Sequence, residues 1–301
     1  MNLYELSNVV RREVPREWSD DVRDMDAVYS YFEGLVLPTL DSSRIGEYRR
    51  VFRLLLAWSA GGKKPTQAQA EVFFHAKVEF AQLRRIIAAA SASSDQDSWN
   101  KQLCTLANDL AVPTRKAKHS SARDFQWEAY LAAIFELSGC TVHFQEPPDL
   151  IVSTDSFRLG CAAKRPRSVR KIEANCRDAA NQIRRSGLPG IVALDLSFAL
   201  GVGGCINTDD IEGAATYVEA ATVQFLAQHG SVLARTCDAE SVIAIITYLH
   251  MPVLVIPTLE VTSAFRWTIL PRLKPTDSRF HWIWDLERRI DSGVFNAHAA
   301  R

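Results

Sequence analysis

The chain has 301 residues, 47% of them hydrophobic, so it can bury the core of one large domain or two modest ones. Lysine plus arginine and aspartate plus glutamate number 35 each, so any attraction to nucleic acid or a membrane surface must be local. The charged N-terminus lacks an apolar segment of signal-peptide length, and the six cysteines form no CxxC pair. We therefore expect a soluble, cytoplasmic protein without a membrane partner.

Residues up to about 112 show helical periodicity nearly everywhere. Apolar side chains recur at three- and four-residue spacing in residues 44–59 and again in residues 67–90, which predicts a helical bundle. Apolar residues then disappear in residues 113–121, where charge and serine take over. We place a domain junction there, with an all-α N-terminal region at residues 1–118 and an α/β domain at residues 119–301.

Beyond this junction, short apolar or β-branched runs alternate with helical segments. The expected strands are residues 141–144, 150–153, 157–163, 190–196, 241–248 and 266–270. The expected helices are residues 124–138, 168–185, 211–229 and 282–290. Polar residues and a proline interrupt the apolar run at residues 242–256, which suits two buried strands better than a membrane span. The pattern predicts an α/β fold with a mixed sheet.

Two carboxylates stand where a site could form, one on a helix and one at the head of a strand. Glu128 shares a helical line with Ala132 and Phe135, so it starts from a partly inward position where an unpaired charge is costly. Taken alone, Glu128 is better explained as a rim glutamate in a salt bridge. Asp149 follows two prolines that set an extended backbone and place it at the mouth of the strand. The plain alternative for Asp149 is an acidic turn residue beside proline.

Lys164 ends the next apolar strand and shares a face with Gly160 and Ala162. Those small side chains leave room for a ligand or a close backbone approach. A lysine at this place can also extend its ammonium group to solvent, but its pairing with Asp149 across a short hairpin favours a functional role. On the following helix, the amide of Gln182 can hydrogen-bond a phosphate, a base or a metal-bound water.

Residues 157–186 carry nine basic side chains against two acidic ones, a local net charge of +7. A basic, partly helical patch beside a carboxylate suits the binding of a phosphate backbone. The candidate nucleic-acid-binding residues are Arg165, Arg167, Arg170, Lys171 and Asn175. Surface helices are often arginine-rich for solubility alone. The patch by itself is therefore weak evidence for nucleic-acid binding, and Asp149 and Lys164 beside it strengthen that evidence.

The ordered set of Glu128, Pro148-Asp149, Ala162-Ala163-Lys164 and Gln182 resembles the PD-(D/E)XK superfamily of nucleases. The resemblance covers residues 124–197 and implies a restriction-endonuclease-like mixed sheet flanked by helices. It also implies a metal-dependent nuclease that hydrolyses phosphodiester bonds of DNA or RNA. In such a protein, Glu128 and Asp149 would bind Mg²⁺ or Mn²⁺, Lys164 would position the attacking water, and Gln182 would complete the pocket.

Ala162 departs from the family pattern, because it stands where a metal-binding acid is expected and offers no ligand oxygen. Glu173 and Asp178 fall off the helical line that joins Asn175 to Gln182, so Glu128 is the expected second ligand. The rival hypothesis is a catalytically inactive nuclease-like module that binds nucleic acid or a protein partner. A third hypothesis is that the N-terminal helices carry the function by binding a protein partner. DNA is the expected nucleic acid, and a homodimer is left open.

Overall fold

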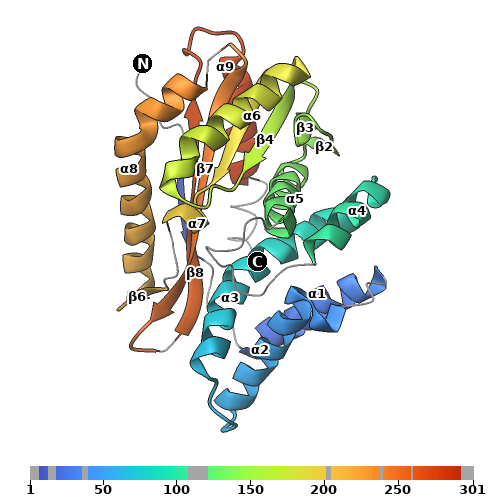
Figure 1. Cartoon of the computed structure of the whole chain (residues 1–301), viewed down its shortest axis with the longest axis vertical. Helices are drawn as coiled ribbons and strands as arrows, with labels where there is room; N and C mark the ends of the chain where they lie inside the picture. Colours follow the sequence, from blue (N-terminus) through green and yellow to red (C-terminus); the bar gives the residue numbers. More distant parts are fainter. Residues whose placement is uncertain are drawn as a thin grey trace.

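The computed structural model describes residues 7–12, 18–35, 40–107, 121–200, 205–237, 240–258 and 260–292 (Figure 1). The boundary expected between residues 118 and 119 lies outside these ranges. The described residues form an α/β structure in which helices flank a mixed sheet and further helices come first in the chain. The predicted fold class is confirmed at this level.

The helical N-terminal region is present as expected. Its elements are α1 (Trp18–Gly34), the short 3-10 helix η1 (Leu40–Ser42), α2 (Arg44–Ser59), α3 (Gln67–Ala92) and α4 (Gln96–Leu106). The Ser43 hydroxyl accepts a hydrogen bond from the Gly46 amide and starts α2. Thr66 and Gln69 form a capping box that starts α3. Local sequence signals therefore define where these helices begin.

Within the described residues, eight strands form one sheet in the order β1-β8-β7-β5-β4-β3-β2, with β6 beside β7. The strands are β1 (Ser7–Arg12), β2 (Thr141–Phe144), β3 (Leu150–Ser153), β4 (Arg158–Lys164), β5 (Gly190–Asp195), β6 (Ile206–Thr208), β7 (Val242–Val255) and β8 (Glu260–Pro271). β4, β5 and β7 are parallel, whereas β2, β3 and β8 pair antiparallel with their neighbours. The predicted mixed sheet is confirmed.

Two features of the sheet differ from the sequence expectation. β1 lies in the region expected to be all-α, yet it pairs antiparallel with β8 along its length. The apolar run at residues 242–256 forms one strand, β7, instead of two. β8 pairs with β7 from Ala244 to Val255, so the polar residues of the run do not interrupt the strand. In both cases a partner distant in sequence stabilises the strand.

Helices cover both faces of the sheet (Figure 1). α6 (Ile172–Ser186) and α8 (Ile211–Thr236) pack in one apolar cluster with Ala162 of β4, and α5 (Ser121–Leu137) and α9 (Phe280–Ile290) pack in another with Ala163. This alternation follows from the two-residue repeat of a strand. The short helix α7 (Ser197–Leu200) follows β5. β4 is therefore enclosed between α5 and α6, the helices that carry Glu128 and Gln182.

The N-terminal helices share their apolar core with the α/β part. Phe52 of α2 and Phe80 of α3 belong to the same cluster as Trp127 of α5 and Tyr248 of β7. The Trp127 and Tyr248 rings stack with their centroids 5.3 Å apart. α5 is thus held between the helical region and the sheet. None of the helices in the described ranges is long and apolar enough to cross a membrane.

Candidate functional site

The site forms where β3 begins and β4 ends, because antiparallel pairing brings these two ends together. The Asp149 side chain is buried, and its Oδ2 accepts a hydrogen bond from the Ala163 amide at 2.7 Å. The same oxygen lies 3.3 Å from Nζ of Lys164, in a salt bridge. Oδ1 accepts a 3.2 Å hydrogen bond from Nε2 of Gln182. The carboxylate therefore uses about three of its four lone-pair positions.

Pro148 and Gly160 fix the start of β3. A Cβ atom built on Gly160 would lie 2.9 Å from Cγ of Pro148, so the absence of a side chain at position 160 lets the proline ring approach β4. Ala162, the next residue on this face, is fully buried among apolar side chains beneath α6. The room that Gly160 and Ala162 were expected to leave for a ligand is therefore filled by the protein itself.

Glu128 approaches the same place from α5, on the opposite face of β4. Burial and the negative charge of Asp149 raise the pKa of Glu128 to about 8, although Lys164 acts in the other direction. The two carboxyl groups are thus close enough for their charges to interact. The described residues contain no group of three or more His, Cys, Asp or Glu side chains placed to hold a metal ion. A cation here would have two carboxylate ligands.

Arg165, predicted to bind nucleic acid, is engaged within the protein. Its side chain is 12% exposed and forms a 2.9 Å salt bridge with Asp195 at the end of β5. Nη1 of Arg165 also donates a 3.2 Å hydrogen bond to the backbone carbonyl of Arg123 on α5. Arg165 therefore ties β4 to β5 and α5 immediately after Lys164.

The other predicted nucleic-acid-binding residues lie near the start of α6. Arg170 and Lys171 are exposed, and Arg167 is partly exposed in the segment that follows β4. The Asn175 side chain donates a 2.8 Å hydrogen bond to the carbonyl of Lys171 within its own helix. None of these four residues, nor Arg165, is among the described residues that line the cavity beside Lys164. These five predicted residues therefore lie outside the lining of this cavity.

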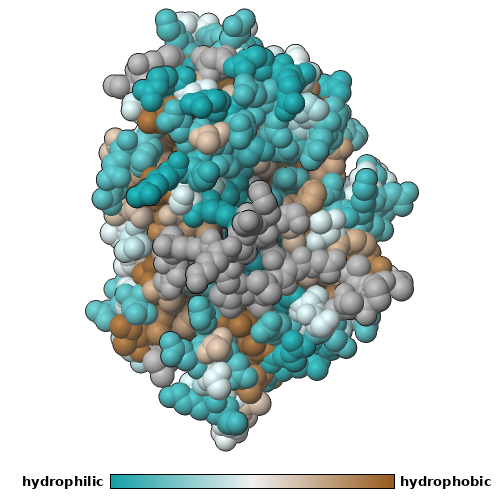
Figure 2. All heavy atoms as spheres, viewed as in Figure 1, coloured by the Kyte–Doolittle hydropathy of each residue, from teal (hydrophilic) through white to brown (hydrophobic). Residues whose placement is uncertain are grey.

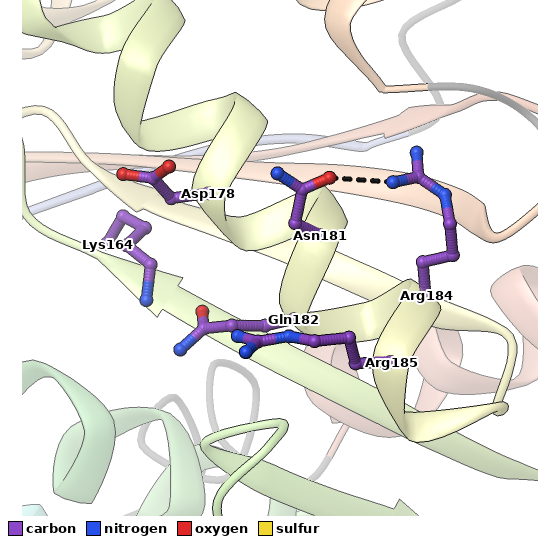
Figure 3. A pocket seen from close by; sticks show the side chains of 6 residues that line it. All are labelled: Lys164, Asp178, Asn181, Gln182, Arg184 and Arg185. Carbon is purple, nitrogen blue, oxygen red and sulfur yellow. Dashed lines mark hydrogen bonds between the residues drawn. The ribbon is translucent and has the colours of Figure 1, made fainter.

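An open cavity of about 670 Å³ adjoins the cluster (Figure 3). Its lining side chains are Lys164, Asp178, Asn181, Gln182, Arg184 and Arg185. All except Lys164 come from α6, between its middle and its last turn, and Figure 2 shows mainly hydrophilic side chains over the part of this face where α6 lies.

The lining of the cavity corrects one sequence expectation. Asp178 was placed off the line of Gln182, yet both side chains line the same cavity. The signal that could have found Asp178 and Arg185 is their spacing of four and three residues from Gln182, which puts all three on one helical face. Asn181 has a comparable spacing, three residues from Asp178 and four from Arg185, and Arg184 was counted only as part of the basic patch.

No family model, curated protein or solved structure matches the chain. The resemblance to the PD-(D/E)XK nucleases therefore stands on the order of its residues in the sequence alone. The geometry of the site brings Asp149, Lys164 and Gln182 into one hydrogen-bonded cluster.

Proposed function

We propose that the chain is a metal-dependent nuclease with a restriction-endonuclease-like fold that hydrolyses phosphodiester bonds, with DNA as the first candidate substrate and RNA as the second. One observation carries the proposal. Lys164 and Gln182, 15 and 33 residues from Asp149 in sequence, both hydrogen-bond its carboxylate beside a cavity with basic lining. Basic groups beside a carboxylate pair are the combination that phosphodiester hydrolysis requires.

Glu128 and Asp149 fit a hard divalent cation, Mg²⁺ or Mn²⁺. Oδ1 of Asp149 accepts one hydrogen bond and retains a lone pair, and the raised pKa of Glu128 reflects a place where a nearby positive charge would stabilise the carboxylate. Mg²⁺ often takes one or two protein carboxylates and completes its shell with water and substrate phosphate. When bound, such an ion would polarise the phosphate and lower the pKa of a coordinated water.

The remaining residues orient this pair and meet the substrate. The Ala163 amide and the Gln182 amide hold the two oxygens of Asp149 in place. The Lys164 ammonium lines the cavity and can donate a hydrogen bond to the attacking water or to a phosphate oxygen. Oε1 of Gln182 is buried and accepts no hydrogen bond within the described residues, so it is available to a water proton.

Cleavage assays with Mg²⁺, Mn²⁺ or EDTA on labelled single- and double-stranded DNA and RNA test the proposal. We expect metal-dependent cleavage by the wild type and a loss of at least about 100-fold in Asp149→Asn and in Lys164→Met. Arg53→Gln is the control, because Arg53 lies on α2 and forms a half-exposed salt bridge with Asp26. Absence of cleavage with every substrate, or equal cleavage by all variants, would rule out the nuclease.

A catalytically inactive nucleic-acid-binding module is the second candidate. It is favoured by the three hydrogen bonds that protein groups donate to Asp149, and by the apolar surroundings of Ala162. This candidate predicts binding that weakens with salt, persists in EDTA and survives Asp149→Asn. Neutralising the exposed Arg170 and Lys171 should weaken the binding; unchanged affinity in that double variant would count against this candidate.

A further inference from the structure

The cavity beside Lys164 has an uneven distribution of charge. Lys164, Arg184 and Arg185 contribute three positive charges, and Asp178 contributes one negative charge. The Arg184 side chain donates a 2.6 Å hydrogen bond to Oδ1 of Asn181, as the dashed line in Figure 3 marks. Arg185 is exposed and forms no hydrogen bond or ion pair with any described residue. Its guanidinium is therefore available to a ligand.

We propose that Arg185 binds a second phosphate of the substrate strand, next to the phosphate that faces Lys164. This inference rests on the proposed function, because it takes Lys164 as the contact of the reacting phosphate. Gln182 and Arg185 are three residues apart on one face of α6, an axial rise of about 4.5 Å. Successive phosphates of one strand advance by about 3.4 Å along a duplex and further in an extended strand. Gln182 hydrogen-bonds Asp149 beside Lys164, so Arg185 lies about one nucleotide step along the axis of α6 from this cluster.

The lining and the size of the cavity suit a phosphodiester. A guanidinium presents a planar fork of donors that matches two phosphate oxygens. A volume of about 670 Å³ exceeds what one small inorganic anion fills and lies in the range of cavities that hold small organic ligands. The cavity therefore has room for a nucleotide unit as well as for its phosphate.

Asp178 gives the strand a direction. In Figure 3 the Asp178 carboxylate lies at the upper left, whereas the Arg185 guanidinium lies beside the Gln182 side chain, at the lower side of α6 in this view. A carboxylate repels a phosphate, so the strand leaves Lys164 toward Arg185 and away from Asp178. Removal of the Asp178 charge should then strengthen binding, whereas removal of the Arg185 charge should weaken it.

Arg185 could also serve only to stabilise α6, and experiment can distinguish this structural role from phosphate binding. Arg184 and Arg185 lie in the last turn of α6, where a positive charge stabilises the helix through its dipole. Arg235 is an exposed arginine in the last turn of α8, so Arg235→Gln makes the same change away from the cavity. The dipole explanation predicts equal effects of Arg185→Gln and Arg235→Gln on stability and none on binding.

The test is the affinity for a short fluorescent single-stranded DNA, measured by anisotropy in EDTA over a series of salt concentrations. We expect Arg185→Gln to lower the affinity about tenfold and to reduce the slope of log K against log salt by about 0.7. Arg235→Gln should change neither quantity, and Asp178→Asn should raise the affinity. Wild-type affinity and salt slope in Arg185→Gln would overturn the inference.

Cleavage with Mg²⁺, measured on the same proteins, distinguishes this inference from the proposed function. If the wild type cleaves DNA and Arg185→Gln binds DNA like the wild type, the phosphate site is wrong and the nuclease stands. If the wild type does not cleave DNA but Arg185→Gln binds DNA more weakly than the wild type does, the proposed nuclease activity is wrong. The phosphate site at Arg185 is then retained, as part of a protein that only binds nucleic acid.

Discussion

Pro148 lies so close to Gly160 that a Cβ atom at position 160 would come within 2.9 Å of the proline ring. The contact holds the segment just before β3 against the middle of β4. It therefore fixes the backbone from which the Asp149 side chain projects. The position of the carboxylate depends on a residue that carries no side chain.

Gly160→Ala should consequently destabilise the protein by about 1–3 kcal/mol, because the proline ring cannot rotate away as a flexible side chain would. Urea denaturation measures this loss. Gly34→Ala is the control, since no atom lies within 4 Å of a Cβ at position 34. Equal stability of the two variants would show that Pro148 moves freely.

Glu128 should make the stability of the metal-free protein fall as pH rises. Burial and the Asp149 charge raise its pKa to about 8 from an ordinary value of 4.5. Between these two values the folded protein holds a proton that the unfolded chain has released, so stability is lost as pH increases through this window. We expect the free energy of unfolding to decrease by about 2 kcal/mol from about pH 6 to about pH 9.

Glu128→Gln supplies the control, because its amide cannot ionise and its stability should change less over the same range. Mg²⁺ should also reduce the loss in the wild type, since a bound cation stabilises the carboxylate. Denaturation curves in EDTA and in Mg²⁺ measure both effects. The same pH dependence in the wild type and in Glu128→Gln would exclude Glu128 as the source.

Ala162→Asp should unfold more easily and should not regain stability with Mg²⁺. Ala162 is fully buried in the cluster that contains Ile172, Cys176 and Val192, so an aspartate would carry its charge into apolar surroundings at a cost of about 3 kcal/mol. Ala162→Val adds volume without charge and separates the two causes. Thermal unfolding with and without Mg²⁺ decides the matter; rescue by Mg²⁺ would mean that position 162 faces the ion.

Glu79→Gln should destabilise the protein by about 3–5 kcal/mol, because it leaves buried arginines without their counter-charge. Glu79 forms salt bridges of 2.7 Å with Arg44 and 2.8 Å with Arg123 and accepts a 2.7 Å hydrogen bond from Tyr48. Glu71→Gln, an exposed change on the same helix, is the control. Urea denaturation at neutral pH compares them, and similar midpoints would contradict the prediction.

The same carboxylate predicts acid sensitivity. Burial by itself would raise the pKa of Glu79, but the charges of Arg123, Arg44 and Arg165 lower it to about 2. Its contribution is therefore complete above the ordinary value of 4.5 and is lost as pH falls toward about 2. Glu79→Gln should show a smaller loss of stability than the wild type over that range.

Local patterns predicted much of the fold near the candidate site. The strand at residues 141–144 was predicted with its observed bounds, because a helix-ending glycine precedes it and two prolines follow. The meeting of Asp149, Lys164 and Gln182 was also predictable, since a short hairpin and the next helix connect them. Their chemical roles remain predictions.

Long-range contacts decided what the sequence did not reveal. β1 exists because β8 pairs with it from the other end of the chain, and β7 is continuous because the same strand supports it. Arg165 does not contribute a free charge to the basic patch, because it forms a salt bridge with Asp195 at the end of β5. No periodicity in residues 157–186 contains this information.

By itself, the sequence determined the order of helices and strands and the set of polar residues at the junction of β3, β4 and α6, because spacing along one chain fixes which side chains share a face. Only the tertiary structure decided what surrounds those residues. It buried Ala162 beneath α6, filled the space over Gly160 with Pro148, and left Arg185 and Asp178 open to the cavity. Burial and charge pairing arise from elements that meet only when the sheet and its helices have packed.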